Sequence, residues 1–227
     1  MSILDALDPP LVVGPLDPEK PLRAAVVWLH GLGADGNDFV PVARELARYG
    51  LGDVRFVFPH APVRKVTVNG GMEMRAWYDI VASELDRRED EAGVRESATI
   101  ASALVEEQIA AGIDPSRIVL AGFSQGGAIA LHTALRFAKP LAGALALSTY
   151  LPLSDSVAAE ASSASRELPI FLAHGSQDPI IPLSLSDRSQ ERLAQLGIEV
   201  ELHTYPMPHS VCPEEIRDIA GWLQRVI

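Results

Sequence analysis

Short apolar runs alternate with longer amphipathic segments along most of this 227-residue chain. The apolar runs are bounded by Gly, Pro or Asp, which is typical of strands buried in a parallel sheet. They cover residues 23–30, 53–59, 117–123, 141–148, 168–175 and 200–206. We therefore expect a sheet whose strands are mainly parallel.

The amphipathic segments between these runs predict helices. Residues 37–50 and 96–112 place apolar side chains at helical spacing, and they close on Gly50 and Gly112. Further helices are expected over residues 125–138, 184–196 and 213–226. Because each crossover between strands is long enough to hold a helix, the fold class is α/β, with helices covering both faces of the sheet.

The chain length fits one large domain over residues 1–227, and no repeat or linker suggests a second. Residues 60–95 break the alternation with polar and Gly-rich sequence. We expect this long excursion to lie near the strand ends and to shape a substrate site, since active sites of such sheets lie at the carboxyl ends of the strands.

Composition narrows the partners and the compartment. The 30 acidic residues exceed the 19 basic ones, giving a formal charge of −11, which disfavours nucleic acid and anionic membranes as partners. No apolar stretch is long enough to span a bilayer, and the N-terminus carries acids and prolines instead of a secretory signal. We expect a cytoplasmic protein without stable membrane insertion. Its single cysteine, Cys212, excludes an intrachain disulfide.

The stretch "GFSQG" at residues 122–126 carries the clearest chemical signal. It matches the G-x-S-x-G pattern, with a buried strand before it and a helix after it, as a nucleophile elbow requires. In this interpretation Ser124 is the nucleophile. A Gly-rich loop between strand and helix, with no chemistry, is the alternative that the pentapeptide alone leaves open.

A serine nucleophile needs a general base and an acid that orients the base. Asp178 follows the strand at 168–175, and His209 follows the strand at 200–206. The order serine, acid, histidine is the order of the hydrolase triad. Taken singly, Asp178 is better explained as a turn residue or helix cap and His209 as a surface histidine, so their common order carries the prediction.

The loop "WLHGLGADGNDF" at residues 28–39 follows the first central strand and offers an oxyanion hole. We expect the backbone N–H groups of Leu32 and Gln125 to face the negative oxygen of the tetrahedral intermediate. A phosphate-binding loop is the alternative, but its third glycine and its lysine are missing. No zinc-type Cys/His spacing occurs, so we expect neither metal nor organic cofactor.

These segments, together with "FPHAPVRKVTVNGGMEMRAWYDI", "LSTYLP", "HGSQDPIIP" and "MPHSV", resemble the carboxylesterase and acyl-protein thioesterase family of α/β-hydrolases, in its bacterial carboxylesterase branch. The resemblance implies an α/β-hydrolase fold without a large lid domain. It implies hydrolysis of carboxylic esters and, in some members, of thioesters of acylated proteins. It further implies that Trp77, Tyr150 and Leu151 line the acyl site.

The principal expectation is a serine carboxylesterase that hydrolyses short- to medium-chain esters through an acyl-enzyme intermediate. One alternative is acyl-protein thioesterase or lysophospholipase-like activity on long acyl chains. The other is a small-molecule binding protein of the same fold with little turnover. The expected partner is a small-molecule ester or an acylated protein, and a homodimer is left open.

Overall fold

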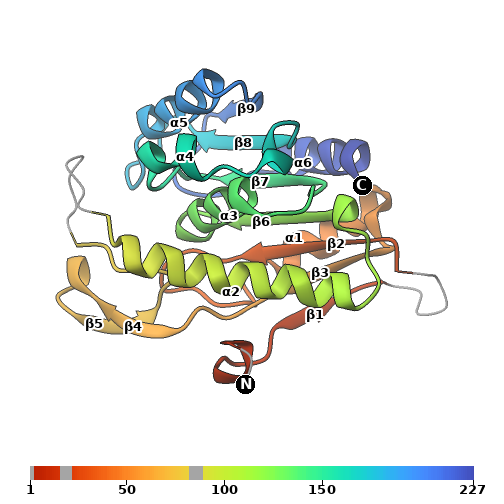
Figure 1. Cartoon of the computed structure of the whole chain (residues 1–227), viewed down its shortest axis with the longest axis horizontal. Coiled ribbons are helices and arrows are strands. Elements are labelled where there is room, and N and C mark those ends of the chain that lie inside the picture. Colours follow the sequence, from red (N-terminus) through yellow and green to blue (C-terminus); the bar gives the residue numbers. More distant parts are fainter. Residues whose placement is uncertain (1–2, 16–21, 82–88) are drawn as a thin grey trace.

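The protein is described by a computed structural model that covers residues 3–15, 22–81 and 89–227. A sheet with strand order β1-β3-β2-β6-β7-β8-β9 runs through the centre of the molecule (Figure 1). Its strands are β1 (Leu11–Val13), β2 (Ala24–Leu29), β3 (Val54–Phe58), β6 (Ile118–Phe123), β7 (Gly143–Leu147), β8 (Ile170–Gly175) and β9 (Val200–Tyr205). All neighbouring pairs are parallel except β1 with β3, which confirms the mainly parallel sheet.

Helices cover both faces of this sheet, as the alternating pattern predicted (Figure 1). They are α1 (Val40–Leu46), α2 (Glu91–Ala110), α3 (Gln125–Arg136), α4 (Val157–Glu160), α5 (Leu183–Gln195) and α6 (Pro213–Val226). Successive side chains of a strand point to opposite faces. In β2, Val27 packs into the core beneath α2 and α3, and its neighbour Val26 packs into the core beneath α1 and α6.

Shorter helical pieces connect the main elements. A kinked turn over Ala47–Leu51 continues α1. Single 3₁₀ turns cover Ile3–Ala6, Thr67–Asn69, Pro115–Arg117, Ser154–Ser156 and Ser163–Ser165. These turns are too short to leave a periodic hydrophobic pattern, so the sequence did not predict them.

The helix expected over 96–112 begins earlier, at Glu91. The side chain of Asp90 accepts a hydrogen bond from the backbone N–H of Gly93, at 3.0 Å, and so caps the first turn. Buried Val94 lies within this first stretch. The charged residues around it hide the apolar spacing, which is why the periodic pattern placed the start too late.

The excursion at 60–95 contains more regular structure than expected. An antiparallel hairpin forms from β4 (Val63–Val66) and β5 (Met72–Arg75), apart from the main sheet. The same excursion contains a charged stretch, "ELDRREDEAG" at 84–93. The first half of this stretch lies outside the described residues. The hairpin is largely exposed, so it lacks the alternation of buried and polar positions that marks a half-buried strand.

Candidate active site

Ser124 occupies a sharp turn between β6 and α3. Its φ of 54° and ψ of −121° lie in a region that residues with a Cβ rarely adopt. A Cβ at Gly122 would overlap the backbone of Gly126, and a Cβ at Gly126 would overlap the carbonyl oxygen of Leu29. The two glycines of "GFSQG" therefore allow the close approach of strand, turn and helix that holds this serine at the end of the sheet.

Three predicted residues meet at this turn. The Nε2 atom of His209 lies 2.9 Å from the Oγ of Ser124, and its Nδ1 lies 2.6 Å from the Oδ2 of Asp178. Because a carboxylate only accepts hydrogen bonds, Nδ1 carries the proton and Nε2 is the acceptor for the serine hydroxyl. This is the arrangement in which a histidine removes a proton from a serine.

Asp178 is itself held by the loop after β8. Its other oxygen, Oδ1, accepts hydrogen bonds from the backbone N–H groups of Ile180 and Ile181, at 2.8 and 2.9 Å. The side chain of His174 packs against it, with its Nε2 atom 3.5 Å from Oδ2. Burial lowers the pKa of His174, so this neighbour is neutral at physiological pH. The carboxylate is thus oriented toward His209 by backbone donors.

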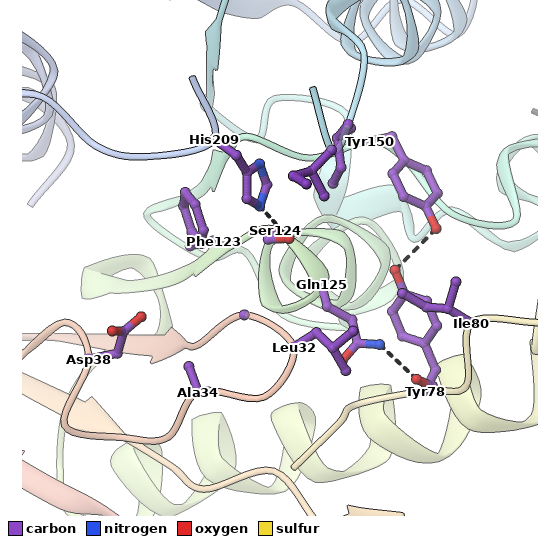
Figure 2. Close-up of a pocket in the computed structure, with 13 residues that line it drawn as sticks. Leu32, Ala34, Asp38, Tyr78, Ile80, Phe123, Ser124, Gln125, Tyr150 and His209 are labelled. Atoms are coloured by element: carbon purple, nitrogen blue, oxygen red, sulfur yellow. Dashed lines mark hydrogen bonds between the residues drawn. The ribbon is translucent and has the colours of Figure 1, made fainter. Parts of the chain in front are cut away.

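The glycine-rich loop after β2 lies directly beside the serine. A Cβ on Gly31 would lie 3.5 Å from the Cβ of Ser124. Leu32 and Gln125 both line the cleft at this point, where the sequence predicted the oxyanion hole (Figure 2).

His30 stabilises this loop from beneath. Its Nε2 accepts a hydrogen bond from the backbone N–H of Ala61 at 3.0 Å, and its Nδ1 lies 2.7 Å from the carbonyl oxygen of Gly31. One nitrogen accepts and the other donates, which is the pattern of a neutral imidazole. Burial lowers the pKa of His30 to about 4, so the ring stays neutral in the physiological range.

The side chain of Gln125 joins the turn to the segment that follows β5. Its Oε1 accepts from the backbone N–H of Trp77, and its Nε2 donates to the carbonyl oxygen of Tyr78, both at 2.7 Å. The indole N–H of Trp77 donates in turn to the carbonyl oxygen of His30 at 2.9 Å. These bonds fix the loop after β2, the first turn of α3 and the 77–78 segment as one unit.

A cleft of about 320 Å³ opens above Ser124 (Figure 2). It is lined by Gly31, Leu32, Ala34, Asp38, Tyr78, Ile80, Phe123, Ser124, Gln125, Tyr150, Ile180, Ile181 and His209. Its walls are mostly apolar. The hydroxyl groups of Tyr78 and Tyr150 lie 3.1 Å apart and bound one side of the cleft (Figure 2).

Of the three residues expected to line the acyl site, only Tyr150 lines the cleft above Ser124. Trp77 is fully buried beneath the cleft. Leu151 lines a second pocket of about 340 Å³ that shares Tyr150 with the cleft. The sequence reasoning missed the apolar contributions of Ile80 and Ile181, although Ile181 lies only three positions after the predicted Asp178.

Within the described ranges, no group of three His, Cys, Asp or Glu side chains is placed to hold a metal ion. No helix of the described segments has the length and apolar character needed to cross a bilayer.

The doubly covered parallel sheet and the turn at Ser124 define an α/β-hydrolase. Residues 14–227 match the phospholipase/carboxylesterase family, and the chain belongs to this family. An acyl-protein thioesterase 1 from Mycosarcoma maydis is 43% identical, over 100% of this chain and 99% of its own length.

Solved structures agree with this placement. SOBER1 from Arabidopsis thaliana superimposes with a TM-score of 0.86 at 30% identity, covering 89% of this chain and 98% of its own. Acyl-protein thioesterase 2 from Zea mays gives a TM-score of 0.82 at 28% identity, covering 95% and 97%. The protein is therefore an enzyme, a hydrolase without a large lid domain. The fungal relative gives no support to the bacterial branch that the motifs suggested.

Proposed function

We propose that this chain is an acyl-protein thioesterase, which hydrolyses the thioester between a fatty acyl group and a protein cysteine. The observation that carries this proposal is the match over the full chain to the Mycosarcoma maydis protein of that name. It replaces the carboxylesterase for short- to medium-chain esters as the favoured interpretation. The apolar cleft above Ser124 supports it, because an acyl chain is bound by apolar side chains.

In the proposed mechanism, Ser124 is the nucleophile and His209 the general base. Nε2 of His209 removes the hydroxyl proton as Oγ attacks the thioester carbonyl, and then gives that proton to the departing thiol. Water next attacks the acyl-enzyme with the same help and releases the fatty acid. Asp178 accepts the hydrogen bond from Nδ1 and so holds the imidazole in the tautomer that the hydrogen bonds define.

The negative oxygen of each tetrahedral intermediate is proposed to bind the N–H groups of Leu32 and Gln125. Such donors commonly contribute about 3 kcal/mol each to transition-state stabilisation. The side-chain bonds of Gln125 and the buried His30 keep both segments in place before substrate arrives. Little reorganisation is then needed during the reaction.

The second candidate is a carboxylesterase acting on short- to medium-chain esters. It is favoured by the Tyr78–Tyr150 pair, which bounds the cleft on the side that an acyl chain would follow. Both activities use the same residues, so they differ in acyl-chain length and in the leaving atom.

The experiment compares S-palmitoyl and S-butyryl thioesters of one cysteine peptide with the corresponding serine esters. We expect the palmitoyl thioester to have the highest kcat/KM. Ser124→Ala should lower turnover by several orders of magnitude with an unchanged circular dichroism spectrum. A preference for the butyryl ester would reverse the order of the two candidates, and full activity of Ser124→Ala would overturn both.

A further inference from the structure

The catalytic cleft has two chemically different sides. Tyr78, Ile80 and Tyr150 lie on one side of Ser124, and Asp38 lies on the other (Figure 2). The first side is apolar apart from the two phenol groups and suits a hydrocarbon chain. The second presents a carboxylate.

The position of His209 indicates which part of the substrate meets each side. The histidine must deliver a proton to the leaving atom, so the leaving group lies on the histidine side of the reacting carbonyl. His209 packs against Phe123, with ring centroids 4.7 Å apart. Phe123 packs in turn against Phe39, the neighbour of Asp38 in the chain, with ring centroids 5.5 Å apart. Figure 2 shows Phe123 and Asp38 on the same side of Ser124. The acyl chain is then left with the side formed by Tyr78 and Tyr150.

Asp38 is a charge without a partner. Among the described residues, its side chain forms no hydrogen bond and no ion pair. Partial desolvation, together with the nearby charge of Asp35, raises the pKa of its carboxyl group. A positive group placed beside Asp38 would stabilise its ionised form against both effects, because opposite charges near a protein surface attract over several ångströms.

We propose that Asp38 is a specificity-determining residue that favours substrates carrying a positive charge in the leaving group. In an acylated protein, this charge would be a Lys or Arg next to the acylated cysteine. The choice of a protein thiol as leaving group rests on the proposed function, whereas the charge preference applies to esters and thioesters alike.

The test uses two octanoyl thioesters of equal size that differ only in charge. One is the thioester of thiocholine, and the other is that of neohexanethiol, in which carbon replaces the cationic nitrogen. The measured quantity is the ratio of their kcat/KM values at about pH 8, where carboxylates are ionised. Asp38→Asn removes the charge from the cleft. Asp155→Asn is the matched control, because it removes the same charge from the exposed rim of the neighbouring pocket.

We expect the wild-type protein to favour the cationic thioester, and Asp38→Asn to lower the ratio about three- to tenfold. The kcat/KM of the neutral thioester should change less than that of the cationic one, and the wild-type preference should shrink as salt rises from about 0.02 to 0.5 M. Asp155→Asn should leave the ratio unchanged. Equal ratios in the wild type and Asp38→Asn would overturn the proposal.

The outcome for the proposed function is read separately. If neither thioester is hydrolysed, the thioesterase proposal fails, and the octanoyl esters of choline and neohexanol then report the same charge ratio. If Asp38→Asn lowers the ratio of cationic over neutral ester hydrolysis, the charge preference of Asp38 is supported even though thioesterase activity has been excluded. Absence of turnover with both pairs would overturn both proposals.

Discussion

The side-chain amide of Gln125 closes a pair of 2.7 Å hydrogen bonds with the backbone of Trp77 and of its neighbour Tyr78. Gln125 directly follows Ser124 in the chain, whereas Trp77 comes from the segment after the hairpin. One buried side chain therefore fixes a cleft wall relative to the turn that presents Ser124.

Replacing Gln125 by Ala should reduce both stability and turnover. The change removes the hydrogen bond to the Tyr78 carbonyl oxygen and leaves the buried N–H of Trp77 without its acceptor, at a cost of about 1–3 kcal/mol. We expect the Tm to fall by roughly 2–12 °C and kcat to fall by about tenfold or more, because the backbone N–H of Gln125, the proposed oxyanion donor, moves with the loosened turn. Thermal unfolding and steady-state kinetics with a soluble ester measure the two effects.

Gln108→Ala provides the control for this prediction. Gln108 is also a buried glutamine, but it lies on α2 and its side chain meets Arg55 and the carbonyl oxygen of Leu104. The Gln108→Ala variant should lower the Tm without changing kcat. If Gln125→Ala loses only stability in the same way, its side chain has no role in positioning the donor.

Asp178→Asn should reduce kcat by about 10³–10⁴-fold while the protein stays folded. The asparagine carbonyl can keep the bonds from Ile180 and Ile181, but its NH₂ group then faces Nδ1 of His209. The imidazole is forced into the tautomer that carries a proton on Nε2, so it no longer accepts the proton of Ser124. The kcat of the variant measures this loss of activity, and its Tm shows whether the protein stays folded. A loss of less than tenfold would contradict the proposed role of Asp178 in orienting His209.

The fold could be predicted from the sequence wherever buried segments are long and regular. The strands β2, β6 and β8 are almost fully buried, so their apolar runs were unambiguous. The edge strand β1 has only three residues, and none of them is buried. The sequence gives no comparable signal for such an element, because its pairing with β3 depends on long-range contacts.

For the candidate site too, some features could be predicted from the sequence and others could not. Ser124, Asp178 and His209 could be predicted as candidates because the chemistry of a triad requires a fixed order at the strand ends, and the structure brings these three side chains within hydrogen-bonding distance. The contact between Tyr78 and Tyr150 joins two segments far apart in the sequence. Side-chain contacts of this kind have no periodicity and no motif, so the shape of the cleft could not be predicted.

Tyr150→Ala should shift the preferred acyl chain toward greater length. The Tyr150 ring lines both the catalytic cleft and the neighbouring pocket, so its removal joins the two spaces. Each additional buried CH₂ contributes about 0.8 kcal/mol when it is fully removed from water. We expect the ratio of kcat/KM for dodecanoyl over butyryl esters to rise about three- to tenfold.

Tyr150→Phe separates the ring from its hydroxyl group. It removes the hydrogen bond to Tyr78 and keeps the bulk, so we expect the chain-length profile of the wild type. An equal shift in the Phe and Ala variants would mean that the hydrogen bond, and not the ring, limits the acyl chain. If neither variant shifts the preferred acyl-chain length, the acyl chain does not bind beside Tyr150.

The carboxyl group of Glu215, in the first turn of α6, should make stability depend on pH. The residue is completely buried, and its two oxygens have no hydrogen-bond partner among the described residues. Burial is the main cause that raises the pKa of this group to about 8. The ordinary glutamic acid pKa lies near 4.5, so the folded protein holds a proton that the unfolded chain loses.

The direction of the effect follows from this difference. Glu215 costs no stability below about pH 4.5, and the cost grows as the pH rises toward 8, where it reaches roughly 3–5 kcal/mol. Glu215→Gln has the shape of the neutral acid and never ionises. Denaturant unfolding at several pH values between about 5 and 8 should show the variant gaining stability over the wild type as the pH rises. A constant difference across this range would mean that Glu215 keeps the same charge in the folded and unfolded states.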